Sequence, residues 1–243
     1  MVKELSPQAE ITGSNLSSTE TQIPEGIPEY ELEAGLKSLF ERINQELEVK
    51  STVVILIAGG SCSGKTTVVA QKTKEQFDPD VRILSMDDYY RGKTFMETQA
   101  KSGNPINWEQ PEAVDLKLVR RHLERLKKGE TIQKPVYNFK TSEPEEFENF
   151  EPSRVFIVEG LFALVDEIKE FGDIKVFIDT SKYVSLFRRM LRDNKRAGKK
   201  PRETVSYVRE TVIPQYERLV RPTKLNADMI INNNKHNPRV VVK

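Results

Sequence analysis

A glycine-rich segment early in the chain carries the residues with the clearest chemistry. Its residues are Gly59, Gly60, Ser61, Cys62, Ser63, Gly64, Lys65, Thr66 and Thr67. They match G-x-x-x-x-G-K-[ST], the pattern of a phosphate-binding loop. The glycines allow main-chain N–H groups to turn inward around phosphates. We therefore expect Lys65 to reach the β- and γ-phosphates of a nucleotide, and the Thr66 hydroxyl to bind Mg²⁺.

Two further segments offer carboxylates that could act beside these phosphates. Asp87 and Asp88 follow one short apolar run, and Glu159 follows another. A carboxylate at such a place can accept the proton of an attacking hydroxyl, a role for which we favour Asp87, with Asp88 as the alternative. Glu159 suits a direct or water-mediated hold on Mg²⁺. The competing interpretation is that these acids only cap the turns and helices that follow them.

Basic residues between positions 181 and 200 form a third feature that could take part in chemistry. The whole chain has 38 Lys and Arg against 37 Asp and Glu, so this cluster is a local concentration of positive charge. Arginines that close over a transferring phosphoryl group stabilise its charge and exclude water. A solvated helix face is the alternative. The residues are Arg188, Arg189, Arg192, Lys195, Arg196, Lys199 and Lys200.

Short apolar runs predict the strands that position these groups. Residues 52–58 are continuously apolar and largely β-branched, which is typical of a parallel strand buried on both faces. We predict five strands, at residues 52–58, 81–86, 154–158, 174–178 and 229–231, alternating with helices. This order predicts a three-layer α/β/α fold with a parallel sheet in the middle. Ligands of such sheets bind at the carboxyl ends of the strands, where the loop and the carboxylates fall.

The first part of the chain divides into two segments. Residues 1–28 are rich in Ser, Thr, Glu, Gln and Pro without apolar periodicity, and we predict a flexible tail. Leucines and other apolar residues then recur at helical spacing over residues 29–48, which predicts an amphipathic helix. This helix would open a single folded domain over residues 29–243.

Composition argues against several classes of protein. A formal net charge of +1 gives no strong field to attract nucleic acid or an anionic membrane. The apolar runs are too short to cross a bilayer, and the N-terminus lacks the features of a secretory signal. The single cysteine, Cys62, cannot form an internal disulfide. We therefore expect a cytoplasmic protein without a nucleic-acid or membrane partner.

An ordered set of motifs resembles the uridine/cytidine kinase family of P-loop kinases over about residues 53–233. The motifs are the loop at 59–67, LSMDDYYR, NWEQPEAVD, PVYNF, IVEG, RRMLRD and PTKLNAD. The resemblance implies that ATP or GTP, with Mg²⁺, phosphorylates the 5′-hydroxyl of a nucleoside, uridine or cytidine in particular. It also implies that copies of the chain can self-associate.

The resemblance assigns roles to single residues. Asp87 falls at the general base and Glu159 at a metal-associated glutamate. Glu109 and Arg189 fall where the family grips the ribose 2′ and 3′ hydroxyls, with Glu109 in place of the usual aspartate. Arg192 and Arg196 fall in a helical lid at about residues 188–202 and would contact the nucleotide.

An acceptor pocket is also implied. Its walls would be formed by Tyr90, Tyr137 and Phe139, and a β-hairpin insertion at about residues 130–153 would cover it. Aromatic packing within the hairpin itself is the equally weighted alternative. Uridine and cytidine kinases place a histidine just after this motif, where Lys140, Thr141 and Ser142 stand here, and Asn138 replaces an aspartate. Losing a hydrogen-bonding group of this kind changes which substrates a site accepts. In the lid, Ala197 and Lys199 replace arginines of the family.

Three other functions remain open on the sequence. A related kinase could act on a phosphorylated sugar or on an alcohol like pantothenate, and a basic acceptor pocket would favour it. A nucleotide-dependent switch or binding protein would hydrolyse triphosphate slowly without an acceptor. A catalytically idle scaffold would be expected to lack Lys65 or Asp87, and both are present.

Overall fold

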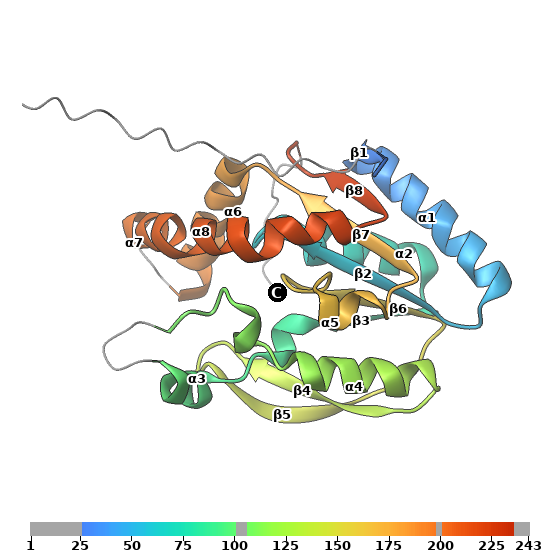
Figure 1. Cartoon of the computed structure of the whole chain (residues 1–243), viewed down its shortest axis with the longest axis horizontal. Helices are drawn as coiled ribbons and strands as arrows, with labels where there is room; N and C mark the ends of the chain where they lie inside the picture. Colours follow the sequence, from blue (N-terminus) through green and yellow to red (C-terminus); the bar gives the residue numbers. More distant parts are fainter. Residues whose placement is uncertain (1–25, 101–105, 198–200, 236–243) are drawn as a thin grey trace, which may run out of the picture.

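A parallel sheet runs through the centre of the molecule, and helices cover both of its faces (Figure 1). This computed structural model describes residues 26–100, 106–197 and 201–235. Most of the predicted tail at residues 1–28 lies outside these ranges. The strands are ordered β1-β8-β7-β2-β6-β3 and all neighbouring pairs are parallel. Their bounds are β1 Glu29–Glu31, β2 Val53–Gly59, β3 Val81–Ser85, β6 Val155–Glu159, β7 Ile174–Asp179 and β8 Met229–Asn232.

The sheet has six strands, so the prediction of five is wrong by one. Residues 29–31, predicted as the start of a helix, form β1 instead, and helix α1 spans Leu32–Val49. Tyr30 lies opposite Ile231 in the parallel pairing of β1 with β8. The free edge of β8 offers backbone hydrogen bonds to an extended segment, and this pairing overrides the local helical pattern.

A buried lysine fastens this added strand to the end of the neighbouring strands. Lys224 is 9% exposed, and its Nζ lies 3.2 Å from Glu29 Oε1 and 2.7 Å from Asp179 Oδ2. Glu29 opens β1, whereas Asp179 closes β7. One ammonium group therefore joins the N-terminal strand to the sheet.

Two hydrophobic cores, one on each face of the sheet, account for the helical layers. Every residue of β2 is buried, and its side chains alternate between the cores. Leu39 and Ile43 of α1 pack on one face, whereas Val119 and Leu123 of α4 (Leu116–Lys127) pack on the other. The predicted three-layer α/β/α fold is confirmed.

The remaining helical segments connect these layers or surround the site. They are η1 Lys65–Ala70, α2 Gln71–Phe77, η2 Met86–Tyr89, α3 Lys93–Gln99, η3 Pro111–Ala113, α5 Asp166–Lys169, α6 Lys182–Ala197, α7 Pro201–Tyr207, η4 Val208–Val212, α8 Ile213–Gln215, η5 Tyr216–Val220 and η6 Arg221–Asn226. Within the described ranges, none of the helices combines the length and the apolar character that crossing a bilayer requires.

A separate antiparallel hairpin stands beside the main sheet (Figure 1). It consists of β4 (Ile132–Asn138) and β5 (Glu143–Phe150), with Ile132 opposite Phe150 at its base. Its register shifts between Val136 and Tyr137. The hairpin insertion expected from the sequence is therefore present, and its strand β4 packs against η2 and α4.

The buried pair Tyr89 and His122 joins η2 to α4. The Tyr89 hydroxyl and His122 Nδ1 share a hydrogen bond of 2.8 Å. Burial lowers the pKa of His122 to about 4, and the neighbouring Arg125 and Arg121 lower it further. The imidazole is therefore neutral in the folded protein at neutral pH.

We expect this pair to make the fold sensitive to mild acid. His122 has a pKa of about 4 in the folded protein against 6.5 ordinarily, so its neutral form contributes about 3 kcal/mol to the free energy of unfolding above pH 6.5. That contribution is lost as the pH falls from 6.5 to about 4. Urea unfolding of wild type and His122→Asn over this range should show a steeper loss in wild type. Parallel curves would contradict the expectation.

Candidate active site

The phosphate-binding loop follows directly from the central strand β2. Gly59 has φ +146° and Gly64 has φ +97°, conformations that side chains other than glycine rarely adopt. A Cβ atom would lie 2.4 Å from the Ile178 carbonyl oxygen at Gly59, and 2.3 Å from Asn233 Nδ2 at Gly64. Both glycines are therefore required by space as well as by backbone conformation.

Three side chains hold a carbonyl of this loop from outside. The Ser63 carbonyl oxygen accepts hydrogen bonds from Asn233 Nδ2 at 2.7 Å, Thr180 Oγ1 at 3.2 Å and Arg188 Nη1 at 3.4 Å. Arg188 Nη1 also donates to the Cys62 carbonyl at 3.3 Å. Because the carbonyl groups point toward these partners, the N–H groups of the loop are available to an anion on its other side.

Lys65 begins η1 beneath this loop. It is 8% exposed, and its Nζ donates to the Gly60 carbonyl at 2.9 Å. The ammonium group is therefore held along the loop, where the motif predicts that it meets phosphates. Thr66 and Thr67 follow it and are exposed.

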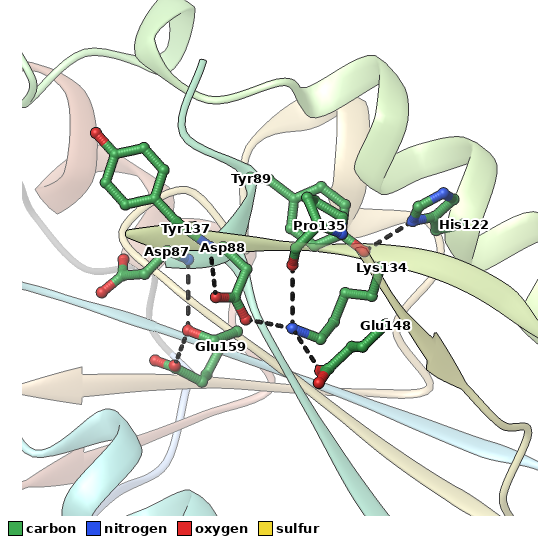
Figure 2. Close-up of polar contacts among 10 residues, drawn as sticks. Asp87, Asp88, Tyr89, His122, Lys134, Pro135, Tyr137, Glu148 and Glu159 are labelled. Carbon is green, nitrogen blue, oxygen red and sulfur yellow. Dashed lines mark hydrogen bonds and ion pairs between the residues drawn. The ribbon is translucent and has the colours of Figure 1, made fainter. Parts of the chain in front are cut away.

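Carboxylates gather at the ends of the adjacent strands β3 and β6 (Figure 2). Glu159 is buried, and Ser85 Oγ donates to its Oε1 at 2.6 Å. Burial raises the pKa of Glu159, nearby Asp87 raises it further, and Lys65 opposes both. Asp87 is exposed on η2. These effects show that Asp87, Glu159 and the loop lysine share one region.

The oxygens here suit a magnesium ion. Thr66 is close enough to Glu159 to lower the pKa of its carboxyl, so the two predicted metal-binding groups lie in one region. Mg²⁺ in nucleotide sites commonly takes one or two protein oxygens and completes its shell with water and phosphates. A single carboxylate and a hydroxyl fit that demand. No group of three or more His, Cys, Asp or Glu that could hold a metal occurs within the described ranges.

Arg188 and Arg192 of α6 face the loop and do not belong to a purely solvated surface. Arg188 is 8% exposed. Arg192 Nη1 lies 3.4 Å from Ser61 Oγ, and its Nε and Nη2 contact Asp193 Oδ1 at 3.0 and 2.9 Å. The side chain of Arg196 lies outside the part of the chain that the structure describes, although its backbone belongs to α6.

A second group of residues forms a pocket wall beside Asp87. Arg189 Nη2 contacts Glu109 Oε1 at 3.0 Å, and each side chain is 11% exposed. Nη1 of Arg189 is buried without a hydrogen-bond partner among the described residues. An acceptor and an unsatisfied donor therefore lie side by side, as binding of two adjacent hydroxyls would require.

Aromatic rings line the neighbouring part of this region. The ring centroid of Tyr90 lies 5.6 Å from that of Tyr137 and 5.9 Å from that of Trp108. Tyr137 in turn lies 5.1 Å from Phe139, whose side chain is half exposed. The rings thus form a continuous row from η2 to the hairpin turn. Asn138, next to that turn, donates to Glu145 Oε2 at 2.6 Å and helps to close it.

Residues 54–238 match the model of the phosphoribulokinase/uridine kinase family. The chain belongs to this family. It is 38% identical over 181 residues to a uridine kinase of Bacillus pumilus, covering 74% of this chain and 85% of the relative. It is 36% identical over 194 residues to a uridine kinase of Clostridium perfringens, covering 78% and 91%.

Solved kinase structures share the fold of this uridine kinase family member. D-glycerate 3-kinase from Cryptococcus neoformans superposes with a TM-score of 0.63 at 14% identity, covering 82% of this chain and 94% of that chain. Phosphoribulokinase from Rhodobacter spheroides gives 0.58 at 14% identity, covering 75% and 70%. The motif-based resemblance is confirmed, and the protein is a phosphotransferase that acts on an alcohol group.

Some residues of this site were not assigned a role from the sequence. Arg188 belongs to the basic cluster and to the RRMLRD motif without a role of its own, and Thr180 and Asn233 were given none. All three follow the carboxyl ends of β7 or β8, so the rule that sheet ligands bind at strand ends was the available signal. Trp108 lies within the motif NWEQPEAVD, in which the family resemblance gives a role only to the neighbouring Glu109.

We predict that Gly64→Ala weakens nucleotide binding at least about tenfold, because positive φ costs about 1 to 3 kcal/mol and the new methyl group meets Asn233. Gly129→Ala is the matched control, since Gly129 has φ +77° with nothing within 4 Å of its Cβ position. Titration with a fluorescent ATP analogue should separate the two variants. Equal affinities would show that the loop tolerates the methyl group.

Proposed function

We propose that this protein transfers the γ-phosphoryl group of ATP or GTP to the 5′-hydroxyl of a pyrimidine nucleoside, uridine or cytidine, in the cytoplasm. One observation carries the proposal. Tyr90 lies near Asp87, Glu109 and Arg189, so an exposed carboxylate, an acid–arginine pair and an aromatic ring share one region. A nucleoside has a matching hydroxyl, diol and flat ring.

Each group would act on a stated atom. The loop N–H groups and Lys65 bind the phosphates, and Arg192 donates to the oxygens of the transferring group. Asp87 accepts the proton of the 5′-hydroxyl as its oxygen bonds to the γ-phosphorus and the bond from that phosphorus to the β,γ-bridging oxygen breaks. Mg²⁺ held by Thr66 and Glu159 would neutralise charge on the phosphates.

The pocket wall would hold the nucleoside. Glu109 and Arg189 would bind the ribose 2′ and 3′ hydroxyls, and the rings of Tyr90, Tyr137 and Phe139 would contact the base. The family's base-reading histidine is absent, so we expect weak discrimination between uracil and cytosine, because rejection of an analogue depends on such a buried polar contact.

A panel of acceptors tests this function. With ATP and Mg²⁺, uridine and cytidine should both yield 5′-monophosphates, detected by mass spectrometry. The panel also contains a sugar phosphate, glycerate and pantothenate. If only the non-nucleoside acceptors are phosphorylated, the substrate is another small alcohol. If triphosphate is hydrolysed at the same rate with and without each acceptor, the protein is a nucleotide switch.

We predict that Asp87→Asn lowers kcat by about 10²- to 10⁴-fold, the usual contribution of a positioned base, with unchanged ATP affinity. Asp80→Asn is the matched control. Asp80 precedes the opposite end of β3, is half exposed and pairs only at the surface with Arg154 at 3.3 Å. The control should keep wild-type turnover, measured by coupled release of ADP. Near-normal turnover in Asp87→Asn would remove Asp87 as the base.

A further inference from the structure

The four residues of the short segment η2 differ in burial and in what they contact. Met86 and Tyr89 are each 2% exposed, and Tyr89 is bonded to α4 through His122. Asp88 is partly buried and faces the hairpin, whereas Asp87 is exposed. Figure 2 shows Asp87 and Asp88 pointing away from each other, although they are neighbours in sequence.

Asp88 meets a buried lysine of the hairpin. Lys134 is 5% exposed, and its Nζ lies 2.6 Å from Asp88 Oδ2 (Figure 2). The other oxygen, Asp88 Oδ1, accepts from the Tyr137 backbone N–H at 3.4 Å. One carboxylate therefore contacts β4 on both sides of its shift in register.

The environment of Lys134 makes this contact specific. Besides Asp88, its ammonium contacts Glu148 Oε1 at 3.0 Å and the Pro135 carbonyl at 3.2 Å. An ammonium has three donors, and each has an acceptor here. A buried pair that is satisfied in this way adds little net stability, but removing one partner leaves an uncompensated buried charge.

This ion pair joins two parts of the proposed site. Asp88 is adjacent to the proposed base, and β4 carries Tyr137 of the aromatic row. The hairpin forms its own two-stranded sheet and shares no strand pairing with the main sheet. Its position relative to Asp87 therefore depends on packing and polar contacts, among which this pair joins β4 directly to η2.

We propose that Asp88 and Lys134 are positioning residues, whose ion pair fixes the acceptor-binding hairpin relative to Asp87. The proposal rests on the proposed transfer to an acceptor hydroxyl. It also favours Asp87 over Asp88 as the base, because both oxygens of Asp88 contact the hairpin.

Four variants test the proposal, namely Asp88→Asn, Lys134→Met, the double variant and Glu148→Gln. Each of the first two should lower kcat about 10- to 100-fold, since small misplacements of reacting groups have effects of this size. ATP affinity and hydrolysis without acceptor should stay at the wild-type level. The double variant should lose no more turnover than the more impaired single variant, because the ion pair is already broken in each single variant. Glu148→Gln should behave as wild type, since Glu148 is half exposed.

Hydrogen–deuterium exchange gives a readout without turnover. Amides of residues 132–150 should exchange faster than in wild type in both single variants and in the double variant, since all three lack the ion pair. Asp88→Asn keeps the size of the side chain and carries the test alone if Lys134→Met does not fold.

The possible results separate the two proposals. Wild-type turnover and exchange in Asp88→Asn would overturn the positioning role, as would a double variant whose loss of turnover is the product of the two single losses. If wild type phosphorylates no nucleoside, the proposed function fails, and kcat is then measured with whichever alcohol reacts while the exchange result stands by itself.

Discussion

Three hydrogen bonds to the Ser63 carbonyl oxygen are the interaction on which the rest of this site depends. Ser63 presents its carbonyl oxygen to Asn233, Thr180 and Arg188, which come from β7, β8 and α6 or follow them directly. Each peptide group of the loop has a dipole, and these three donors hold the Ser63 carbonyl end of its dipole toward β7, β8 and α6. The amides that remain on the inner side provide positive potential without a mobile side chain, so an anion can bind with little rearrangement.

Buried charges around the loop are arranged in compensated sets. Lys65 opposes the acid pair of Asp87 and Glu159, and Lys134 is matched to Asp88. Three carboxylates close together at a sheet edge would otherwise repel one another and favour protonation. Two buried ammonium groups from separate segments offset these charges, Lys134 beside Asp88 and Lys65 beside Glu159. The two adjacent aspartates can therefore differ in what they contact.

Local pattern was sufficient where one segment determines its own structure. Continuous apolar residues identified β2, and the loop motif located Lys65 and Thr66, because both depend on neighbours in sequence. Strand β1 and Lys134 could not be found this way. Glu29–Glu31 is extended only because β8 offers an edge, and a lysine between polar residues of a hairpin gives no sign that Asp88 will meet it. The pairing of Glu109 with Arg189 came from family resemblance, since no spacing relates them.

Strand β1 has a consequence for how copies of the chain could meet. An uncovered β8 would present a row of backbone donors and acceptors, which invites another sheet to add to it. Three residues of β1 occupy that row, and Lys224 secures them by its bridge from Glu29 to Asp179. Direct pairing of β8 with a second molecule is therefore blocked, and the short strand β1 is the edge that the sheet presents on this side.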